Sequence, residues 1–412
     1  MTCFRWRIEM SDSLSQYPAR VRELNVGLNS QLAGQLIHGS QYSFSYEKEA
    51  FPVSLSMPNR LDPYVSGKLP PIFTMNLPEG FVRRYIEERL RRYAKVDEMY
   101  LLALQRDKGI GALNYHSDEL PEGTTEAVAL NEILSWNNPN EALFPQLLER
   151  FYLQTAISGV QPKVVVPSEK ATLVYPDLIV KAADEEFPNL TANEFICLSA
   201  ADYCGLETPE FWLSDNREHF VMKRFDIDGD KKYAVEDFCV LTKRDSADKY
   251  RSSYEQVMKV VQLFTQSAEQ LRKVYEYIVF NVLIGNGDAH LKNFSVYYSA
   301  EAPERIKLTP IYDVTHTLIY PTIDNHMALK LFGSKEFPTQ HYLRKLGEDF
   351  GIAEPQLVIT NFAEKLVTFM EGFNQWDVSP ELKPSMEKHL SSIMVSEPTV
   401  SGYRHHKKRK YT

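Results

Sequence analysis

Short runs of β-forming residues alternate with turn residues in the first part of the chain, as in ELNVGLNSQLAGQLI and YSFSYE. This pattern predicts β-strands with turns at Gly27, Asn29 and Gly39. After a proline-rich stretch, GFVRRYIEERLRRYAKVDEMYLLALQ predicts a basic helical run whose charges form a solvated helix face. We therefore expect a small α/β unit at residues 20–118, following an irregular N-terminus at 1–19.

An acidic, turn-rich stretch at residues 119–140 predicts a linker. The pattern beyond it predicts a strand-rich lobe at residues 141–240. The elements expected in this lobe are a helix near 141–155, strands at VVV (164–166) and LIVK (178–181), and a hairpin of EFWLS and HFVMKRF that turns at Asp215-Asn216.

The segment TANEFICLSAADYCG predicts a helix in the same lobe. Thr191 and Glu194 have the spacing of a capping box, and Gly205 is a helix-ending residue. Cys197 and Cys204 are seven residues apart, so we expect them to share the buried face of this helix.

Residues 241–395 have a mainly helical pattern. Ser267 and Gln270 predict a second capping box, which opens the helix LRKVYEYIVFNVLI. The end of the chain, residues 396–412, contains RHHKKRKYT and predicts a solvated basic tail. A strand-rich lobe followed by a helix-rich lobe suggests a cleft between the two.

Composition narrows the class of protein. Hydrophobic residues make up 43% and charged residues 25% of the 412 residues, as in an ordinary globular protein. The net charge of -9 argues against general affinity for nucleic acids or anionic membranes. None of the four cysteines forms a CxxC pair, and no stretch approaches the length of a membrane span. We expect a soluble, cytoplasmic protein.

The segment IGNGDAHLKNFSVYY (284–298) carries the strongest chemical signal. Asp288 and Asn293 have the D-x-x-x-x-N spacing of a protein-kinase catalytic loop. A carboxylate at the first position can reach an acceptor hydroxyl, while an amide oxygen at the last can bind a metal on the phosphates. This spacing alone is weak evidence, because Asp, Gly and Asn are common in turns.

Two further elements strengthen this interpretation. The segment LTPIYD leads into Asp313, and a hairpin of SVYY and RIKLTPIYD would return Asp313 to the side of Asn293. Carboxylates and an amide that converge in this way imply Mg²⁺. Lys181 ends the apolar run DLIVK and precedes the helix that bears Glu194, as expected for a phosphate-binding lysine and its partner.

The motifs ISGVQPK, LIVK, VMKRFD, VEDFC, GNGDAHLKNFS and LTPIYD occur in this order, with SLSMP and NLPEG in front of them. Together they resemble the motif series of HipA-type serine/threonine kinases over residues 20–390. The resemblance implies an α+β, bilobal protein-kinase-like fold. It also implies a small N-terminal α/β accessory domain and a helix-rich C-terminal lobe.

The resemblance also implies roles for individual residues. Asp288 matches the catalytic base, Asn293 and Asp313 the Mg²⁺ ligands, and Lys181 the lysine that binds the ATP phosphates. Lys292 would neutralise the transferring phosphate. The other implied nucleotide-binding residues are Ser158, Gly159, Val160, Gln161 and Lys163 of ISGVQPK, Arg224 and Phe225 at the hinge, and His290, for which a buried structural role is an equal alternative.

A HipA-type kinase transfers phosphate from Mg-ATP to a serine or threonine hydroxyl of a protein. The resemblance implies that this protein is an aminoacyl-tRNA synthetase. It also implies autophosphorylation at Ser158. Such a kinase is restrained by a HipB-like antitoxin, through which it reaches DNA. Two alternatives stay open on the sequence: a small-molecule or lipid kinase with the same apparatus, and a non-catalytic corepressor.

Overall fold

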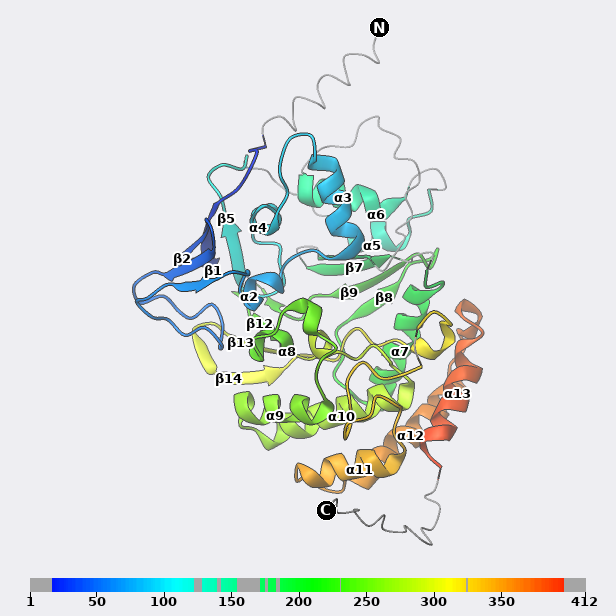
Figure 1. The fold of residues 1–412 in the computed structure, drawn as a ribbon. Coiled ribbons are helices and arrows are strands. Elements are labelled where there is room, and N and C mark those ends of the chain that lie inside the picture. The colour runs from blue at the N-terminus through cyan, green and yellow to red at the C-terminus, as the bar shows by residue number, and fades with distance from the viewer. Residues whose placement is uncertain are drawn as a thin grey trace, which may run out of the picture.

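A computed structural model describes residues 17–121, 128–138, 142–153, 171–174, 177–182, 186–229, 231–323 and 325–395 of the chain. Figure 1 shows an N-terminal unit beside a strand-rich lobe, with a helix-rich lobe on the far side. The expected α+β, bilobal architecture is confirmed. Among the described residues, no helix has both the length and the apolar character needed to cross a membrane.

The N-terminal unit is an antiparallel sheet with strand order β4-β3-β2-β1-β5, covered by short helices. Its elements are β1 (Glu23–Leu28), β2 (Gln31–His38), β3 (Tyr42–Tyr46), β4 (Tyr64–Ser66), α2 (Pro71–Thr74), α3 (Gly80–Leu90), α4 (Glu98–Gln105) and β5 (Leu113–His116). Leu24, Val26 and Leu28 alternate along β1 and are buried, as the period of a strand requires.

The turn predictions in this unit had mixed outcomes. Asn29 adopts a left-handed conformation (φ 54°) in the β1–β2 turn. Gly27 lies inside β1 at a register shift, so its prediction as a turn was wrong. A Cβ atom there would come within 2.2 Å of the Asn114 side chain, and this close approach accounts for the glycine.

The basic helical run is broken into α3 and α4. Asp97 is the N-cap of α4: its side chain accepts a hydrogen bond from the Tyr100 backbone nitrogen (3.1 Å). The second helix is buried along its whole apolar segment from Met99 to Leu104. The solvated, charged helix face that the sequence predicts for the whole run is therefore present only on α3.

The central sheet of the molecule has strand order β6-β7-β9-β8 and is antiparallel. Its strands are β6 (Ala171–Val174), β7 (Leu178–Ala182), β8 (Phe211–Leu213) and β9 (His219–Lys223); α5 (Leu130–Leu134), α6 (Leu143–Leu148), a π-helix (Glu149–Leu153) and α7 (Leu190–Cys204) accompany them. The strand expected at 164–166 lies outside the described residues. The stretch expected as a linker contains α5, whose Ile133 is buried.

The central sheet is buried on both faces. Leu178 and Val180 of β7 belong to the core of the N-terminal unit, whereas Ile179 belongs to the core of the helix-rich lobe. Alternation along a strand places Lys181 on the same face as Ile179. The pleat of β7 thus directs this lysine toward the helix-rich lobe.

The helix α7 begins at Leu190, with Asn189 at its N-cap and no side-chain capping bond. The predicted capping box was therefore wrong: Thr191 is inside the helix and its hydroxyl bonds the Arg217 carbonyl (2.6 Å). Gly205 ends the helix in a left-handed conformation, as expected. Cys197 and Cys204 are both buried, also as expected.

The helix-rich lobe contains a three-stranded sheet of order β12-β13-β14 and six helices among the described residues. Its elements are β12 (Ala234–Asp237), α8 (Phe238–Leu241), α9 (Tyr254–Thr265), α10 (Ala268–Ile284), β13 (Ser295–Ser299), β14 (Ala302–Leu308), α11 (Gln340–Asp349), α12 (Pro355–Gly372) and α13 (Leu382–Ile393), and a small hairpin of β10 (Ile227–Asp228) and β11 (Lys231–Lys232) precedes them. Ser267 caps α10 by accepting from the Gln270 nitrogen (3.3 Å). The Gln270 side chain bonds the Leu308 nitrogen instead, so the predicted box is half formed.

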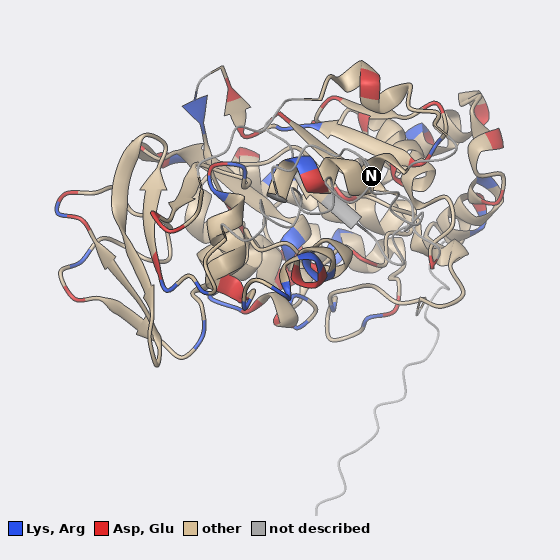
Figure 2. Ribbon diagram, turned by 90° about the horizontal axis from the view of Figure 1, so that it is seen from above, with Lys and Arg blue, Asp and Glu red and all other residues tan. Residues whose placement is uncertain are grey.

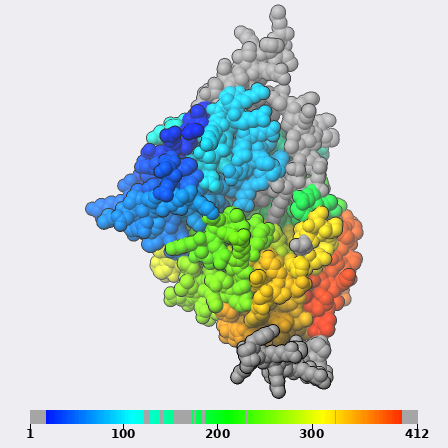
Figure 3. Space-filling view, viewed as in Figure 1, coloured from blue at the N-terminus to red at the C-terminus, as the bar shows by residue number. Residues whose placement is uncertain are grey.

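Polar contacts fasten the N-terminal unit to the kinase-like lobes. Glu236 accepts hydrogen bonds from the Ser54 hydroxyl (2.6 Å) and the Leu55 nitrogen (2.7 Å). Figure 3 shows the two parts in contact over a wide area. Lysine and arginine are interspersed with acidic residues over the described ribbon in Figure 2, so the net negative charge is spread over the molecule.

A buried guanidinium strengthens this junction. Arg224 pairs with Asp226 (2.6 Å), and their side chains are 0% and 2% exposed. Arg224 also donates to the Gly109 carbonyl (2.6 Å), while Asp226 accepts from the Gly111 nitrogen (2.7 Å). Both members of the pair therefore bind backbone groups of the N-terminal unit.

Replacing Arg224 with methionine would leave the Asp226 carboxylate buried without its guanidinium. Breaking one side of a buried pair costs about 3–5 kcal/mol, so we expect R224M to lower the free energy of unfolding by this amount in urea denaturation. The double variant R224M/D226N should recover part of the loss, because it carries no uncompensated charge. An R224M stability within about 1 kcal/mol of wild type would contradict this account.

A buried histidine makes the helix-rich lobe sensitive to acid. His316 contacts the Ile284 carbonyl through Nδ1 (2.7 Å) and the Ser385 hydroxyl through Nε2 (2.7 Å). Burial lowers the pKa of His316 to about 4; the hydrogen bond that its Nδ1 donates to the Ile284 carbonyl opposes this shift, and the nearby His389 adds slightly to it.

We expect the free energy of unfolding to fall as the pH drops from about 6.5 to about 4. In this window the unfolded chain takes up a proton at His316 and the folded chain does not, so up to roughly 3 kcal/mol is lost. Urea midpoints measured across this range for wild type and H316N would test it. Equal pH slopes for the two proteins would contradict it.

Candidate active site

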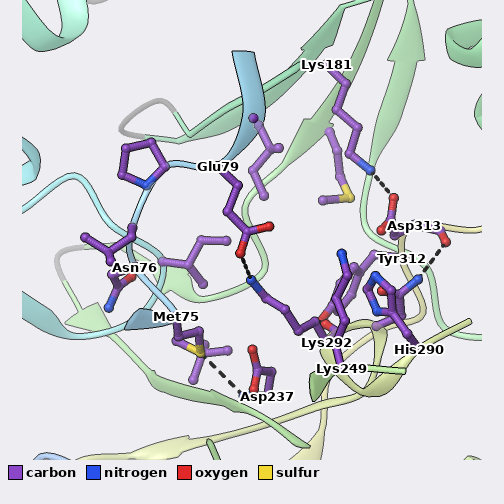
Figure 4. A pocket seen from close by; sticks show the side chains of 18 of the residues that line it. Met75, Asn76, Glu79, Lys181, Asp237, Lys249, His290, Lys292, Tyr312 and Asp313 are labelled. Atoms are coloured by element: carbon purple, nitrogen blue, oxygen red, sulfur yellow. Dashed lines mark hydrogen bonds and ion pairs between the residues drawn. The ribbon is translucent and has the colours of Figure 1, made fainter. Parts of the chain in front are cut away.

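A cavity of about 510 Å³ lies where the N-terminal unit, the central sheet and the helix-rich lobe meet. Asp288, Asn293, Asp313 and Lys181, which are far apart in the sequence, all line it. Figure 4 shows Lys181, Lys292 and Asp313 at this pocket, each on a separate segment of the chain. Lys292, predicted to act in catalysis, and His290, predicted to bind the nucleotide, also line it.

The loop that carries Asp288 starts where α10 ends. Gly285 has a left-handed conformation (φ 77°), and a Cβ atom there would come within 2.7 Å of His316. Asn286 then fixes the loop by donating to the Asn281 side chain (2.7 Å) and accepting from the Asp288 nitrogen (3.0 Å). The carboxylate of Asp288 accepts a hydrogen bond from the Tyr250 hydroxyl (3.0 Å).

The side chain of Asn293 has a defined orientation. Its amide nitrogen donates to the backbone carbonyls of Asp288 (3.1 Å) and Asp313 (3.3 Å). Because carbonyls only accept hydrogen bonds, these contacts fix which end of the amide is nitrogen. The amide oxygen is thereby directed away from both carbonyls, which is the orientation a metal ligand needs.

Asp313 reaches the pocket through the predicted β13–β14 hairpin. Tyr312 anchors the segment, since its hydroxyl contacts the Ser295 hydroxyl (2.6 Å) and donates to the Lys292 carbonyl (2.8 Å). Asp313 itself has a left-handed backbone (φ 57°), which is uncommon for a residue other than glycine. Its position is therefore imposed by the surrounding contacts.

Lys181 joins the strand β7 to two acidic residues. Its ammonium forms a hydrogen-bonded ion pair with Glu194 of α7 and another with Asp313 (2.8 Å). The side chains of Lys181 and Glu194 are 8% and 2% exposed. Because Glu194 forms no capping box with Thr191, its carboxylate is available to pair with Lys181.

The donor set fits a magnesium ion bound together with phosphates. Asn293 and Asp313 offer an amide and a carboxylate oxygen, the hard ligands that Mg²⁺ prefers. Among the described residues, no group of three or more His, Cys, Asp or Glu side chains is arranged to hold a metal. A site with few protein ligands is typical of Mg²⁺ that is held largely by substrate phosphates and water.

The other residues expected to bind the nucleotide, Arg224, Phe225 and His290, are placed differently from one another. Phe225 lines the pocket and stacks on Tyr312, with ring centroids 5.7 Å apart. The Arg224 side chain is not brought into the pocket, because it is held in the junction with the N-terminal unit. His290 lies on the pocket wall, with its ring edge-on to Tyr250 at 5.2 Å.

The N-terminal unit contributes to this site, which sequence reasoning did not foresee. Glu79 of the NLPEG motif lines the pocket and pairs with Lys292 (2.7 Å). Asp237 of VEDFC lies beside them, and its backbone nitrogen contacts the Met75 sulfur (3.4 Å). The spacing of residues in the sequence could not predict the Glu79–Lys292 pair, because the two residues are 213 positions apart.

The predicted phosphate-covering loop falls outside the described residues. Its expected members, Ser158, Gly159, Val160, Gln161 and Lys163, therefore remain predictions.

Comparisons with known proteins identify the family of this chain. Residues 155–370 match the family described as the HipA-like C-terminal domain, and residues 24–116 match the HipA N-terminal domain. A Sinorhizobium fredii protein with the provisional kinase name Y4dM is 26% identical over 370 residues, covering 82% of this chain and 83% of its own. The serine/threonine-protein kinase toxin HipA of Shewanella oneidensis is 22% identical over 323 residues, covering 70% and 72%.

The solved structure of the Shewanella oneidensis HipA, HipB and operator DNA complex contains a chain of the same fold. It superimposes with a TM-score of 0.65 at 18% identity, covering 90% of this chain and 96% of its own. The family match spans more than half of the chain, and the expected bilobal fold is present. The chain therefore belongs to the HipA family of kinases.

Proposed function

We propose that this protein is a Mg-ATP-dependent serine/threonine protein kinase of the HipA toxin type. The observation that carries the proposal is the convergence of Asp288, Asn293, Asp313 and Lys181 on one cavity. These residues come from a strand, a loop and a hairpin end. Structural stability alone does not account for a buried lysine and several acidic groups in an open pocket.

Each residue has a separate task in the proposed reaction. Asp288 accepts the proton of the acceptor hydroxyl as that oxygen attacks the γ-phosphorus and ADP leaves. Lys181, held by Glu194, binds the α- and β-phosphates of ATP. Asn293 and Asp313 would hold Mg²⁺, which supplies charge neutralisation at the phosphates when it is bound.

The acceptor and the partner are inferred from the family. We propose a protein acceptor, by resemblance an aminoacyl-tRNA synthetase, and autophosphorylation at Ser158. The Shewanella oneidensis relative is found with HipB and operator DNA, and we propose a HipB-like antitoxin for this chain. The net charge of -9 favours contact with DNA through such a partner.

Labelling of a cell lysate with γ-³²P ATP tests the kinase and its acceptor. We expect wild type to label protein, and D288N to label at least about 100-fold less, because the catalytic base is lost. Mass spectrometry of the labelled material identifies the acceptor and shows whether Ser158 carries phosphate. Equal labelling by both proteins, or label only in lipids or metabolites, would contradict the proposal.

Nucleotide binding separates the metal ligands from the base. We expect D313N to weaken the binding of a non-hydrolysable ATP analogue by about tenfold or more in the presence of Mg²⁺, and to change it little without Mg²⁺. D288N is the control, since the base does not hold nucleotide and its affinity should match wild type. Titration calorimetry with and without Mg²⁺ measures both. Mg²⁺-independent affinity in wild type would contradict the assigned metal site.

A further inference from the structure

The wall of the active-site cavity that faces the N-terminal unit includes an ion pair between two domains. Lys292, from the loop that carries Asp288 and Asn293, extends to Glu79 of the N-terminal unit and contacts its carboxylate at 2.7 Å. Figure 4 shows Lys292 directed toward Glu79, while Lys181 is directed toward Asp313. The catalytic loop is thus tied to a separate domain.

A third group completes this contact. The Ser246 hydroxyl donates to the same Glu79 oxygen (2.7 Å) and accepts from the Lys292 ammonium (3.2 Å). Ser246 belongs to the segment between α8 and α9, whose neighbouring Asp245 pairs with Lys68 of the N-terminal unit. The same short segment therefore contacts the N-terminal unit twice and the catalytic loop once.

The electrostatics favour a lasting pair. Burial opposes ionisation of Glu79, but the Lys292 charge and the hydrogen bonds from Lys292 and Ser246 outweigh it and lower the pKa of Glu79 to about 2. The charge of Lys249 also lowers the pKa of Glu79. Glu79 is thus ionised throughout the neutral range and accepts both hydrogen bonds as a carboxylate.

The surroundings also limit what else Lys292 can do. Its side chain is 19% exposed, and Asp237 and Glu79 both act on its charge. Its ammonium contacts the Glu79 carboxylate at 2.7 Å and the Ser246 hydroxyl at 3.2 Å. Its backbone carbonyl, meanwhile, accepts from Tyr312, the residue before Asp313. Lys292 therefore connects Glu79 on one side with the metal-binding segment on the other.

We propose that Glu79 is a positioning residue: through Lys292 and Ser246 it fixes the catalytic loop, so that the active site is complete only with the N-terminal unit docked. Lys292 then acts as the residue that connects the N-terminal unit with the loop that carries Asp288 and Asn293. The inference rests on the proposed kinase function only for its kinetic consequence. The contact itself can be measured without activity.

Hydrogen–deuterium exchange of the full chain measures the contact directly. The His290 nitrogen bonds the Asp288 carbonyl (2.8 Å), and the Asn293 nitrogen bonds the His290 carbonyl (2.9 Å). We expect E79Q to speed exchange at these amides by about tenfold. D377N is the matched control, because it removes the charge of another long-range pair, Arg217–Asp377, which is exposed. Exchange in E79Q equal to that in D377N would overturn the proposal.

Kinetics test the consequence. We expect E79Q to lower kcat by about tenfold to a hundredfold, through misplacement of the loop, and to leave KM for ATP within about twofold of wild type. The double variant E79Q/K292M should be no slower than K292M, because both changes break one connection. Fully additive effects, or a loss confined to KM, would overturn the proposal.

The two proposals fail in different ways. If wild type transfers no phosphate while E79Q still loosens the catalytic loop, the kinase function is overturned and the positioning role stands. If wild type is active and E79Q matches D377N in both exchange and kcat, the kinase stands and the positioning role is overturned.

Discussion

A buried ammonium holds the active site together. Lys181 is almost fully shielded from solvent, and a charge in that environment is stable only when acidic partners compensate it. Glu194 and Asp313 supply that compensation, and each comes from a different part of the fold. A single lysine thus fixes the distance between β7, α7 and the segment that follows β14. The groups proposed to bind the nucleotide therefore depend on this interaction for their relative positions.

The N-terminal unit is a structural part of the kinase. One apolar core runs from its sheet to one face of the central sheet, while a second core covers the opposite face. Glu236 and the Arg224–Asp226 pair add buried polar contacts, whose geometry demands one docking position. Glu79 of the same unit lines the cavity and pairs there with Lys292. Removing the unit would expose an apolar sheet face and take away hydrogen-bond partners of Glu236, Arg224 and Asp226.

Local features of the sequence explain much of the catalytic loop. Gly285 permits the sharp exit from α10, and the hairpin that follows returns Asp313 within twenty residues of Asn293. The predicted groups therefore meet because the chain between them is short and its turns are well specified. The capping box predicted at Thr191 and Glu194 does not form, because Glu194 pairs with Lys181 instead. Here a tertiary contact outweighs a local pattern of two residues.

The sequence by itself determined the strands and helices with strong periodicity and the order of the two lobes, and it predicted Asp288, Asn293, Asp313 and Lys181 as residues of one site. These follow from local spacing and from motif order. Only the tertiary structure decided that Arg224 serves the domain junction, that Gly27 lies within a strand, and that Glu79 reaches Lys292. Contacts between residues that are far apart in the sequence depend on how the domains dock. Docking depends on the shapes of whole surfaces, and these shapes produce no periodic pattern of hydrophobic residues in the sequence.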